Sequence, residues 1–173
     1  EFASLPFNHP LWVLFSSGTT GAPKGIVHGH GGILLEQLKF LGLHVDVREG
    51  DRFFWYCSTS WVMWNVLVSA LLMGATIVTY DGSPKHPDTS VLWKIAGQHR
   101  ASILGVSPAY LQACAKEGLR PRDHGLESLR SVGCTGAPIP LAAYDWVRQQ
   151  LGDEVPLDSV SGGTDVAGGF VAG

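Results

Sequence analysis

Short apolar runs alternate with stretches of helical periodicity along the whole chain. Runs rich in β-branched and aromatic residues indicate buried strands, and apolar residues three and four positions apart indicate helices. The pattern predicts strands at residues 11–16, 52–57, 75–80, 102–106, 129–132 and 155–160. It predicts helices at residues 31–43, 61–73, 89–99, 108–116 and 140–151. Because strands and helices alternate, we expect an α/β fold with a mostly parallel sheet, right-handed crossovers and helices on both faces.

Composition narrows the class of protein further. The 173 residues are 45% hydrophobic and 16% charged, which suits a sheet that is covered on both faces. The net charge of −3 argues against a nucleic-acid partner, and no apolar run of about eighteen residues predicts a membrane span. The three cysteines are far apart and form no C-x-x-C motif, so we expect reduced thiols in a cytoplasmic protein rather than disulfides or a zinc site.

A polar segment rich in glycine and hydroxyl residues directly follows the first predicted strand. Glycines let backbone N–H groups approach a polyphosphate closely, hydroxyls donate hydrogen bonds to it, and a lysine neutralises its charge. The segment is neither a Walker loop nor a dinucleotide fingerprint, because the required glycine and lysine spacings are absent. The candidate phosphate-binding residues are Ser16, Ser17, Gly18, Thr19, Thr20, Gly21 and Lys24.

A second polar segment follows the last predicted strand, at residues 159–165. Two glycines there precede a hydroxyl and a carboxylate, Thr164 and Asp165. A carboxylate near a phosphate-binding loop suits Mg²⁺, which prefers oxygen ligands. Ligands of α/β folds bind beyond the carboxyl ends of the strands, and both polar segments follow a predicted strand. On its own this second segment would more often be an ordinary turn.

Together the two segments resemble the phosphate-binding signature and the second core motif of the adenylate-forming enzymes, the acyl-CoA synthetase and luciferase superfamily. The resemblance implies that Thr164 contacts the α-phosphate and that Asp165 holds Mg²⁺, either directly or through a water. It also places Ser161, Gly162 and Gly163 at the nucleotide. The chain departs from the usual motif twice, because Ser161 replaces an aromatic residue and Asp165 replaces a glutamate.

Two further segments are candidates for the nucleotide and the acid. Residues 133–138 resemble the superfamily segment that lines the adenine pocket, which would bring Gly136, Ala137 and Pro138 to the base; a plain strand-to-helix turn is the alternative. Residues 61–65 resemble the helix that borders the carboxylate substrate. Trp61, Trp64 and Asn65 would line that pocket, and core packing explains them equally well.

Two histidines follow the phosphate-binding segment. On a strand, His28 and His30 would share a face and could bind a metal. The neighbouring glycines favour a loop, and no third ligand is evident nearby. We therefore expect no metal site there.

Within the superfamily the chain is similar to the acetoacetyl-CoA synthetase branch, at residues 26–35, 61–65, 74–84 and 161–165. Both departures in the last motif are typical of that branch. Acetyl- and propionyl-CoA synthetases are the second possibility. The resemblance implies a cytoplasmic acid–thiol ligase that uses ATP, Mg²⁺ and coenzyme A to convert a short carboxylic acid first into an acyl-adenylate and then into a thioester.

Members of this superfamily are several times longer than 173 residues. The resemblance implies that residues 1–173 are part of the large N-terminal, AMP-binding (adenylation) domain, without the flanking N-terminal portion and the C-terminal lid domain. Lys24 does not correspond to the adenylation lysine of the lid, so we expect no turnover by the chain alone. The alternatives are a nucleotide-binding module without ligase activity and a purely structural α/β domain.

Overall fold

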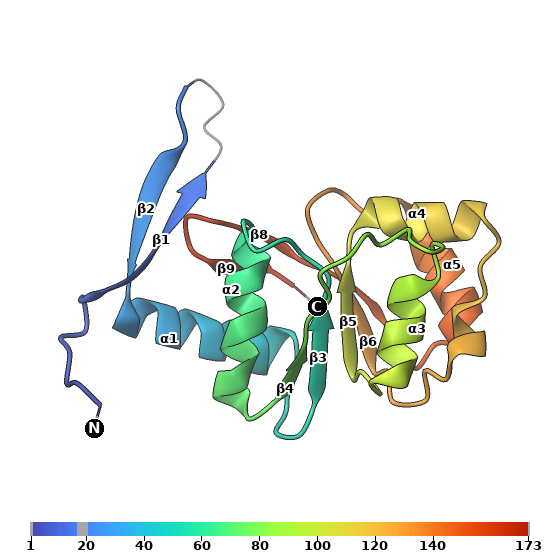
Figure 1. Cartoon of the computed structure of the whole chain (residues 1–173), viewed down its shortest axis with the longest axis horizontal. Helices are drawn as coiled ribbons and strands as arrows, with labels where there is room; N and C mark the ends of the chain where they lie inside the picture. Colours follow the sequence, from blue (N-terminus) through green and yellow to red (C-terminus); the bar gives the residue numbers. More distant parts are fainter. Residues whose placement is uncertain (1, 17–20, 173) are drawn as a thin grey trace.

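The computed structural model describes residues 2–16 and 21–172 and confirms the predicted α/β class (Figure 1). Its centre is a five-stranded parallel sheet with the strand order β4-β3-β5-β6-β7. The strands are β3 (Arg52–Trp55), β4 (Thr76–Val78), β5 (Ile103–Val106), β6 (Ser131–Cys134) and β7 (Leu157–Ser159). Each lies within or close to a predicted strand. Among the described residues, no helix has the length and apolar character needed to cross a membrane.

Two hydrophobic cores lie on opposite faces of the sheet. Neighbouring residues of a strand point to opposite faces, so Phe53 joins one core while Phe54 joins the other. The Phe53 side is covered by α1 (His30–Lys39) with its π-helical extension η1 (Phe40–His44), and by α2 (Val62–Ser69) with the 3₁₀ turn η2 (Ala70–Met73). The Phe54 side is covered by α3 (Val91–Gln98), α4 (Pro108–Lys116) and α5 (Leu141–Leu151).

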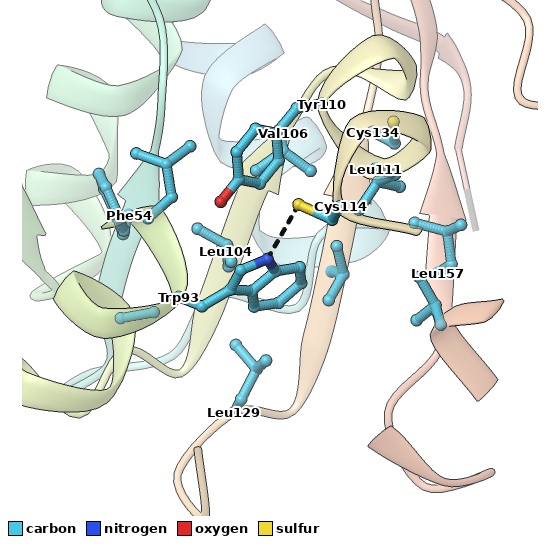
Figure 2. Close-up of a cluster of buried hydrophobic side chains, with 14 of the residues drawn as sticks. Phe54, Trp93, Leu104, Val106, Tyr110, Leu111, Cys114, Leu129, Cys134 and Leu157 are labelled. Atoms are coloured by element: carbon cyan, nitrogen blue, oxygen red, sulfur yellow. Dashed lines mark hydrogen bonds between the residues drawn. The ribbon is translucent and has the colours of Figure 1, made fainter. Parts of the chain in front are cut away.

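Figure 2 shows a buried polar contact in the core on the Phe54 side. The indole N–H of Trp93 donates to Cys114 Sγ over 3.4 Å, and the ring of Trp93 stacks on Tyr110. Burial raises the pKa of the Cys114 thiol, so this thiol stays protonated at neutral pH. All three cysteines are free, as the sequence predicts.

The first predicted strand differs most from expectation. Residues 11–16 do not enter the parallel sheet; β1 (Pro10–Ser16) pairs with β2 (Lys24–Gly29) in a separate antiparallel hairpin beyond α1 (Figure 1). Alternate side chains of β1 are exposed, with Val13 50% and Phe15 67% accessible, so the prediction of a buried strand is wrong. The apolar run suggested two covered faces, whereas the hairpin has one half-buried face. The pattern also missed β2, in which only Ile26 and Val27 are apolar and two glycines, a lysine and a histidine carry little strand signal.

The chain ends in a second short hairpin that the pattern did not predict. Strands β8 (Ser161–Gly163) and β9 (Gly168–Val171) are antiparallel and follow β7 directly. Glycines dominate both strands, so neither has the apolar alternation that would indicate a strand. This hairpin carries the second polar segment.

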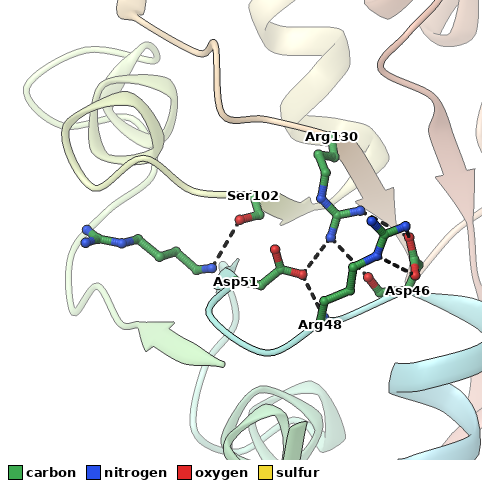
Figure 3. Close-up of polar contacts among 6 residues, drawn as sticks. Asp46, Arg48, Asp51, Ser102 and Arg130 are labelled. Carbon is green, nitrogen blue, oxygen red and sulfur yellow. Dashed lines mark hydrogen bonds and ion pairs between the residues drawn. The ribbon is translucent and has the colours of Figure 1, made fainter. Parts of the chain in front are cut away.

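An ion cluster ties together the loops at the amino-terminal edge of the sheet (Figure 3). Arg130, which precedes β6, lies 2.6 Å from Asp51 and 3.1 Å from Asp46. A hydrogen bond from Arg48, and then the charges of Arg48 and Arg130, lower the pKa of the Asp46 carboxyl below its ordinary value of 3.8. The contribution of Asp46 to stability is therefore present above that pH and is lost as the pH falls further.

We expect Arg130→Ala to lower the free energy of unfolding by about 1 kcal/mol at pH 7, because the cluster is only partly screened by solvent. The loss should shrink at a pH well below 3.8, where Asp46 becomes protonated. Urea denaturation at both pH values measures the difference. Arg120→Ala is the control, since Arg120 forms one exposed pair at 3.5 Å with Asp123. Equal effects of the two substitutions would contradict the role of the cluster.

Candidate functional site

A cavity of about 550 Å³ opens at the carboxyl-terminal edge of the parallel sheet. Its walls come from the segments that follow β3, β6 and β7, together with the end of β1 and Phe40. This is the edge where ligands bind in open α/β sheets. The residues singled out from the sequence that line it are Ser16, Trp61, Gly136, Gly162, Gly163, Thr164 and Asp165.

The other candidate residues that the structure describes are not part of the cavity lining. Outside its lining, Gly21, Lys24, Ala137, Pro138 and Ser161 are all exposed. The remaining four candidates of the phosphate-binding segment lie outside the described residues: Ser17, Gly18, Thr19 and Thr20.

Trp64 and Asn65, the two remaining candidates for the acid pocket, also lie outside the cavity lining. Trp64 is half-buried and packs against the core on the Phe53 side. Asn65 is half-buried. Between the two interpretations of Trp64, these contacts favour core packing.

The phosphate-binding segment connects the two strands of the first hairpin. Ser16 ends β1, Lys24 begins β2, and the two residues are partners across the hairpin. The expectation that this segment follows a strand of the parallel sheet is therefore wrong, because β1 belongs to another sheet. The same expectation holds for residues 161–165, which follow β7. The cavity thus lies between the end of β1 and the segment that follows β7.

Hydrogen bonds fix the backbone that leads into the second polar segment. The Thr135 hydroxyl donates to the Val160 carbonyl over 2.8 Å, and the Val160 N–H donates to the Cys134 carbonyl over 2.9 Å. Gly136 follows with φ 95°, a conformation that favours glycine. The ends of β6 and β7 are thereby held side by side at the cavity.

Thr164 and Asp165 occupy the turn between β8 and β9. The turn closes through a hydrogen bond from the Ala167 N–H to the Thr164 carbonyl, 3.2 Å long. Within residues 2–16 and 21–172 the exposed carboxylate of Asp165 forms no ion pair. It is therefore available to a ligand in the cavity.

The sequence did not identify the contacts that hold this turn. The ring of His28 bonds through Nε2 to the Asp165 carbonyl, and the buried side-chain amide of Gln37 donates to the Ala167 carbonyl. His28 lies on β2 and His30 begins α1, so Gly29 and Gly31 did not indicate a loop. In the described part of the chain no three His, Cys, Asp or Glu side chains form a metal-binding group.

Apolar residues of the cavity wall were also missed. Met63 and Val66 of α2 line it beside Trp61, as does Phe40. For Met63 and Val66 the available signal was their position after the carboxyl end of β3, because that edge of the sheet holds the ligands.

The two sides of the cavity differ in chemistry. Thr164, Asp165 and the glycine backbone offer oxygen and N–H groups, while Trp61 and Met63 offer an apolar wall. Mg²⁺ commonly binds through one or two carboxylates together with phosphate oxygens and waters, so a single carboxylate fits a metal that arrives with a nucleotide.

The thiols beside the cavity are not nucleophiles. Burial raises the pKa of Cys57 to about 11 and that of Cys134 to about 12. Both thiols are protonated at neutral pH, and the thiolate is the reactive form. The site is suited to binding and charge neutralisation rather than to attack by a cysteine.

Comparison with known proteins gives consistent matches. The sequence profile of a family described as AMP-binding enzyme matches residues 3–172. An acetoacetyl-coenzyme A synthetase of Rhizobium meliloti is 46% identical over 99% of the chain, and an acetoacetyl-CoA synthetase of Gallus gallus is 42% identical over 99%. The solved structure of acetoacetyl-CoA synthetase from Streptomyces lividans superposes with a TM-score of 0.95 at 52% identity, covering 99% of this chain and 27% of that one. The chain spans 27% and 26% of the length of the two curated relatives.

Proposed function

Because the chain belongs to the AMP-binding enzyme family, we propose that it forms the nucleotide-binding core of an acid–thiol ligase that activates acetoacetate with ATP. The observation that carries the proposal is the convergence of Ser16, Thr164 and Asp165 with Trp61 at one cavity. The similarity to relatives named acetoacetyl-CoA synthetase supports acetoacetate as the acid.

The proposed reaction has two steps. A carboxylate oxygen of the acid attacks the α-phosphorus of ATP, a carbon–oxygen–phosphorus linkage forms, and pyrophosphate leaves. The coenzyme A thiol, having lost its proton, then attacks the acyl carbon, and AMP leaves with the bonding electron pair. The chain's own groups contribute orientation and charge neutralisation to the first step.

Each group at the cavity has a proposed role in that step. Thr164 donates to an α-phosphate oxygen, and Asp165 holds Mg²⁺ directly or through a water, with Ser161, Gly162 and Gly163 beside it. Bound Mg²⁺ would neutralise charge on the phosphates. Ser16 and Lys24 flank the remaining phosphate-binding residues, which are Ser17, Gly18, Thr19, Thr20 and Gly21.

The base and the acid occupy the rest of the cavity in this proposal. Gly136, Ala137 and Pro138 present backbone to the adenine. The φ of 95° at position 136 favours glycine, which has no side chain to obstruct the base. Trp61 and Met63 enclose the short acyl chain against the apolar wall. Trp64 and Asn65 lie on α2, outside the cavity lining, and would support that wall through the packing of α2.

We assign residues 1–173 to part of an adenylation domain within a longer ligase. The proposal rests on the 26–27% of the relatives' length that the chain spans. The lid and the adenylation lysine would come from the rest of that protein, so the 173-residue chain alone should form no thioester. Three free cysteines suit the reducing cytoplasm, where we place the ligase.

Acid-dependent exchange of pyrophosphate into ATP tests the function in the longer ligase. We expect acetoacetate to support exchange about fivefold better than acetate or propionate, because one additional hydrogen bond to its keto oxygen contributes about 1 kcal/mol. A preference for acetate or propionate would keep the adenylating chemistry and assign the acetyl- and propionyl-CoA synthetase branch. No exchange with any of the three acids would contradict the proposal and favour a nucleotide-binding module without ligase activity.

A further inference from the structure

The turn that carries Thr164 and Asp165 is held from two directions by one continuous segment, β2 and α1. His28 on β2 bonds to the Asp165 carbonyl over 2.9 Å, and Gln37 on α1 bonds to the Ala167 carbonyl. We propose that His28 and Gln37 are positioning residues, which set the turn relative to Ser16 and Lys24 of the first hairpin for adenylation. This inference rests on the function proposed above.

The partners of His28 select one form of its ring. The Trp12 indole can only donate, so its N–H points at His28 Nδ1 over 3.2 Å, and Nδ1 accepts. The Asp165 carbonyl can only accept, so Nε2 carries the proton and donates. The two hydrogen bonds therefore run in one direction, from Trp12 to His28 and from His28 to Asp165. They join both strands of the first hairpin to the turn.

Gln37 holds the turn at a position where the backbone is strained. Ala167 is fully buried and has φ 51°, a left-handed conformation that is unfavourable for alanine. Gln37 is itself fully buried, and its Oε1 has no hydrogen-bond partner in the described part of the chain. An unsatisfied buried acceptor is destabilising, so stability alone would favour an apolar residue here. An apolar residue could not donate the hydrogen bond that Gln37 makes to the Ala167 carbonyl, so the glutamine is explained by its hold on the turn.

Close backbone packing makes α1 and the second hairpin one unit. A Cβ placed on Gly168 would lie 2.0 Å from Glu36 Oε1, and one on Gly169 would lie 2.6 Å from the ring of Phe40. Lys39 also donates to the Gly169 carbonyl over 3.3 Å. A shift of α1 must therefore move β9 and the turn before it.

One continuous segment, β2 and α1, connects Lys24 with the turn that carries Thr164 and Asp165. Lys24 begins β2, His28 lies near the end of that strand, and α1 follows without a break at His30. One segment thus extends from the phosphate-binding loop to the carbonyls behind Asp165. It does not include Trp61 or Met63, which belong to the segment around α2. Loss of the His28–Asp165 or the Gln37–Ala167 hydrogen bond should therefore impair use of the nucleotide and leave binding of the acid unchanged.

Substitutions at both positions test this role. His28→Phe keeps a ring and removes both hydrogen bonds, and Gln37→Leu keeps the approximate size and removes the donor. His28→Gln, which retains an amide donor, should restore part of the function. Trp12→Phe is the matched control, because it removes the indole donor while His28 can still donate to Asp165.

Two readouts are needed, one of them independent of activity. In the 173-residue chain, hydrogen exchange of the peptide spanning residues 161–171 should accelerate about tenfold in His28→Phe and Gln37→Leu, while β5 and β6 stay protected. In the longer ligase, the MgATP concentration for half-maximal pyrophosphate exchange should rise about tenfold, with that for acetoacetate unchanged. A partly unfolded variant would lose maximal rate without moving either concentration.

The outcomes separate this inference from the proposed function. Unchanged hydrogen exchange at residues 161–171 in both variants would overturn it, as would equal shifts for MgATP and the acid. Absence of pyrophosphate exchange in the unsubstituted ligase would overturn the proposed function, and hydrogen exchange in the chain would still decide whether the contacts hold the turn. If Gln37→Leu does not fold, the comparison of His28→Phe with His28→Gln decides.

Discussion

Asp165→Asn in the longer ligase is expected to slow adenylate formation about 10²-fold, the usual cost of removing one preorganised electrostatic group from an active site. The substitution removes the negative charge that we propose holds Mg²⁺ and keeps the side chain's size. It also keeps the backbone carbonyl that accepts the hydrogen bond from His28. Folding should therefore be nearly unaffected, since the side chain is exposed and forms no ion pair within the described residues.

The measurement is pyrophosphate exchange at saturating acetoacetate, with the folded fraction followed by circular dichroism. Asp153→Asn serves as the control, because Asp153 is an exposed aspartate in the loop before β7, away from the cavity lining. Activity that falls only in proportion to folded protein would refute the metal role of Asp165. Equal losses in the two variants would also refute it.

The largest expected effect on stability comes from Gly105→Ala in the centre of the sheet. Gly105 of β5 lies between Trp55 of β3 and Gly133 of β6 in the strand register. A Cβ on Gly105 would lie 1.8 Å from Trp55 Cδ2, and one on Gly133 would lie 2.5 Å from the same indole. Trp55 is buried, so its ring covers both glycines and cannot move without disturbing the core.

We expect Gly105→Ala to lower the free energy of unfolding by about 3 kcal/mol, at the upper end of the usual cost of overpacking. Urea denaturation of the chain measures the loss. Gly32→Ala is the matched control, because Gly32 lies in α1 with open space around it, and alanine there should be neutral or stabilising.

A second substitution identifies the cause of the loss at Gly105. If the clash with Trp55 is responsible, Gly105→Ala combined with Trp55→Leu should be more stable than the sum of the two single changes predicts. Strict additivity would show that the indole is not the obstacle. A Gly105→Ala variant as stable as Gly32→Ala would contradict the packing argument altogether.

The sequence determined the order and the kind of most elements and the identity of the polar segments. Apolar periodicity is a local property, so it identified the five strands of the parallel sheet and the five helices that cover it. The turn motif at residues 161–165 was recognisable for the same reason, since its glycines, hydroxyl and carboxylate are adjacent in the chain.

Only the tertiary structure decided which strand pairs with which, and which side chains meet. The sequence of residues 11–16 is compatible both with the parallel sheet and with a hairpin. The choice depends on the partner strand β2, which has only two apolar residues and therefore gives a weak signal of its own. His28 and Asp165 are 137 residues apart, and Gln37 and Ala167 are 130 apart. No local pattern encodes such contacts, because they arise only when the packing of α1 against the last hairpin brings the two segments together.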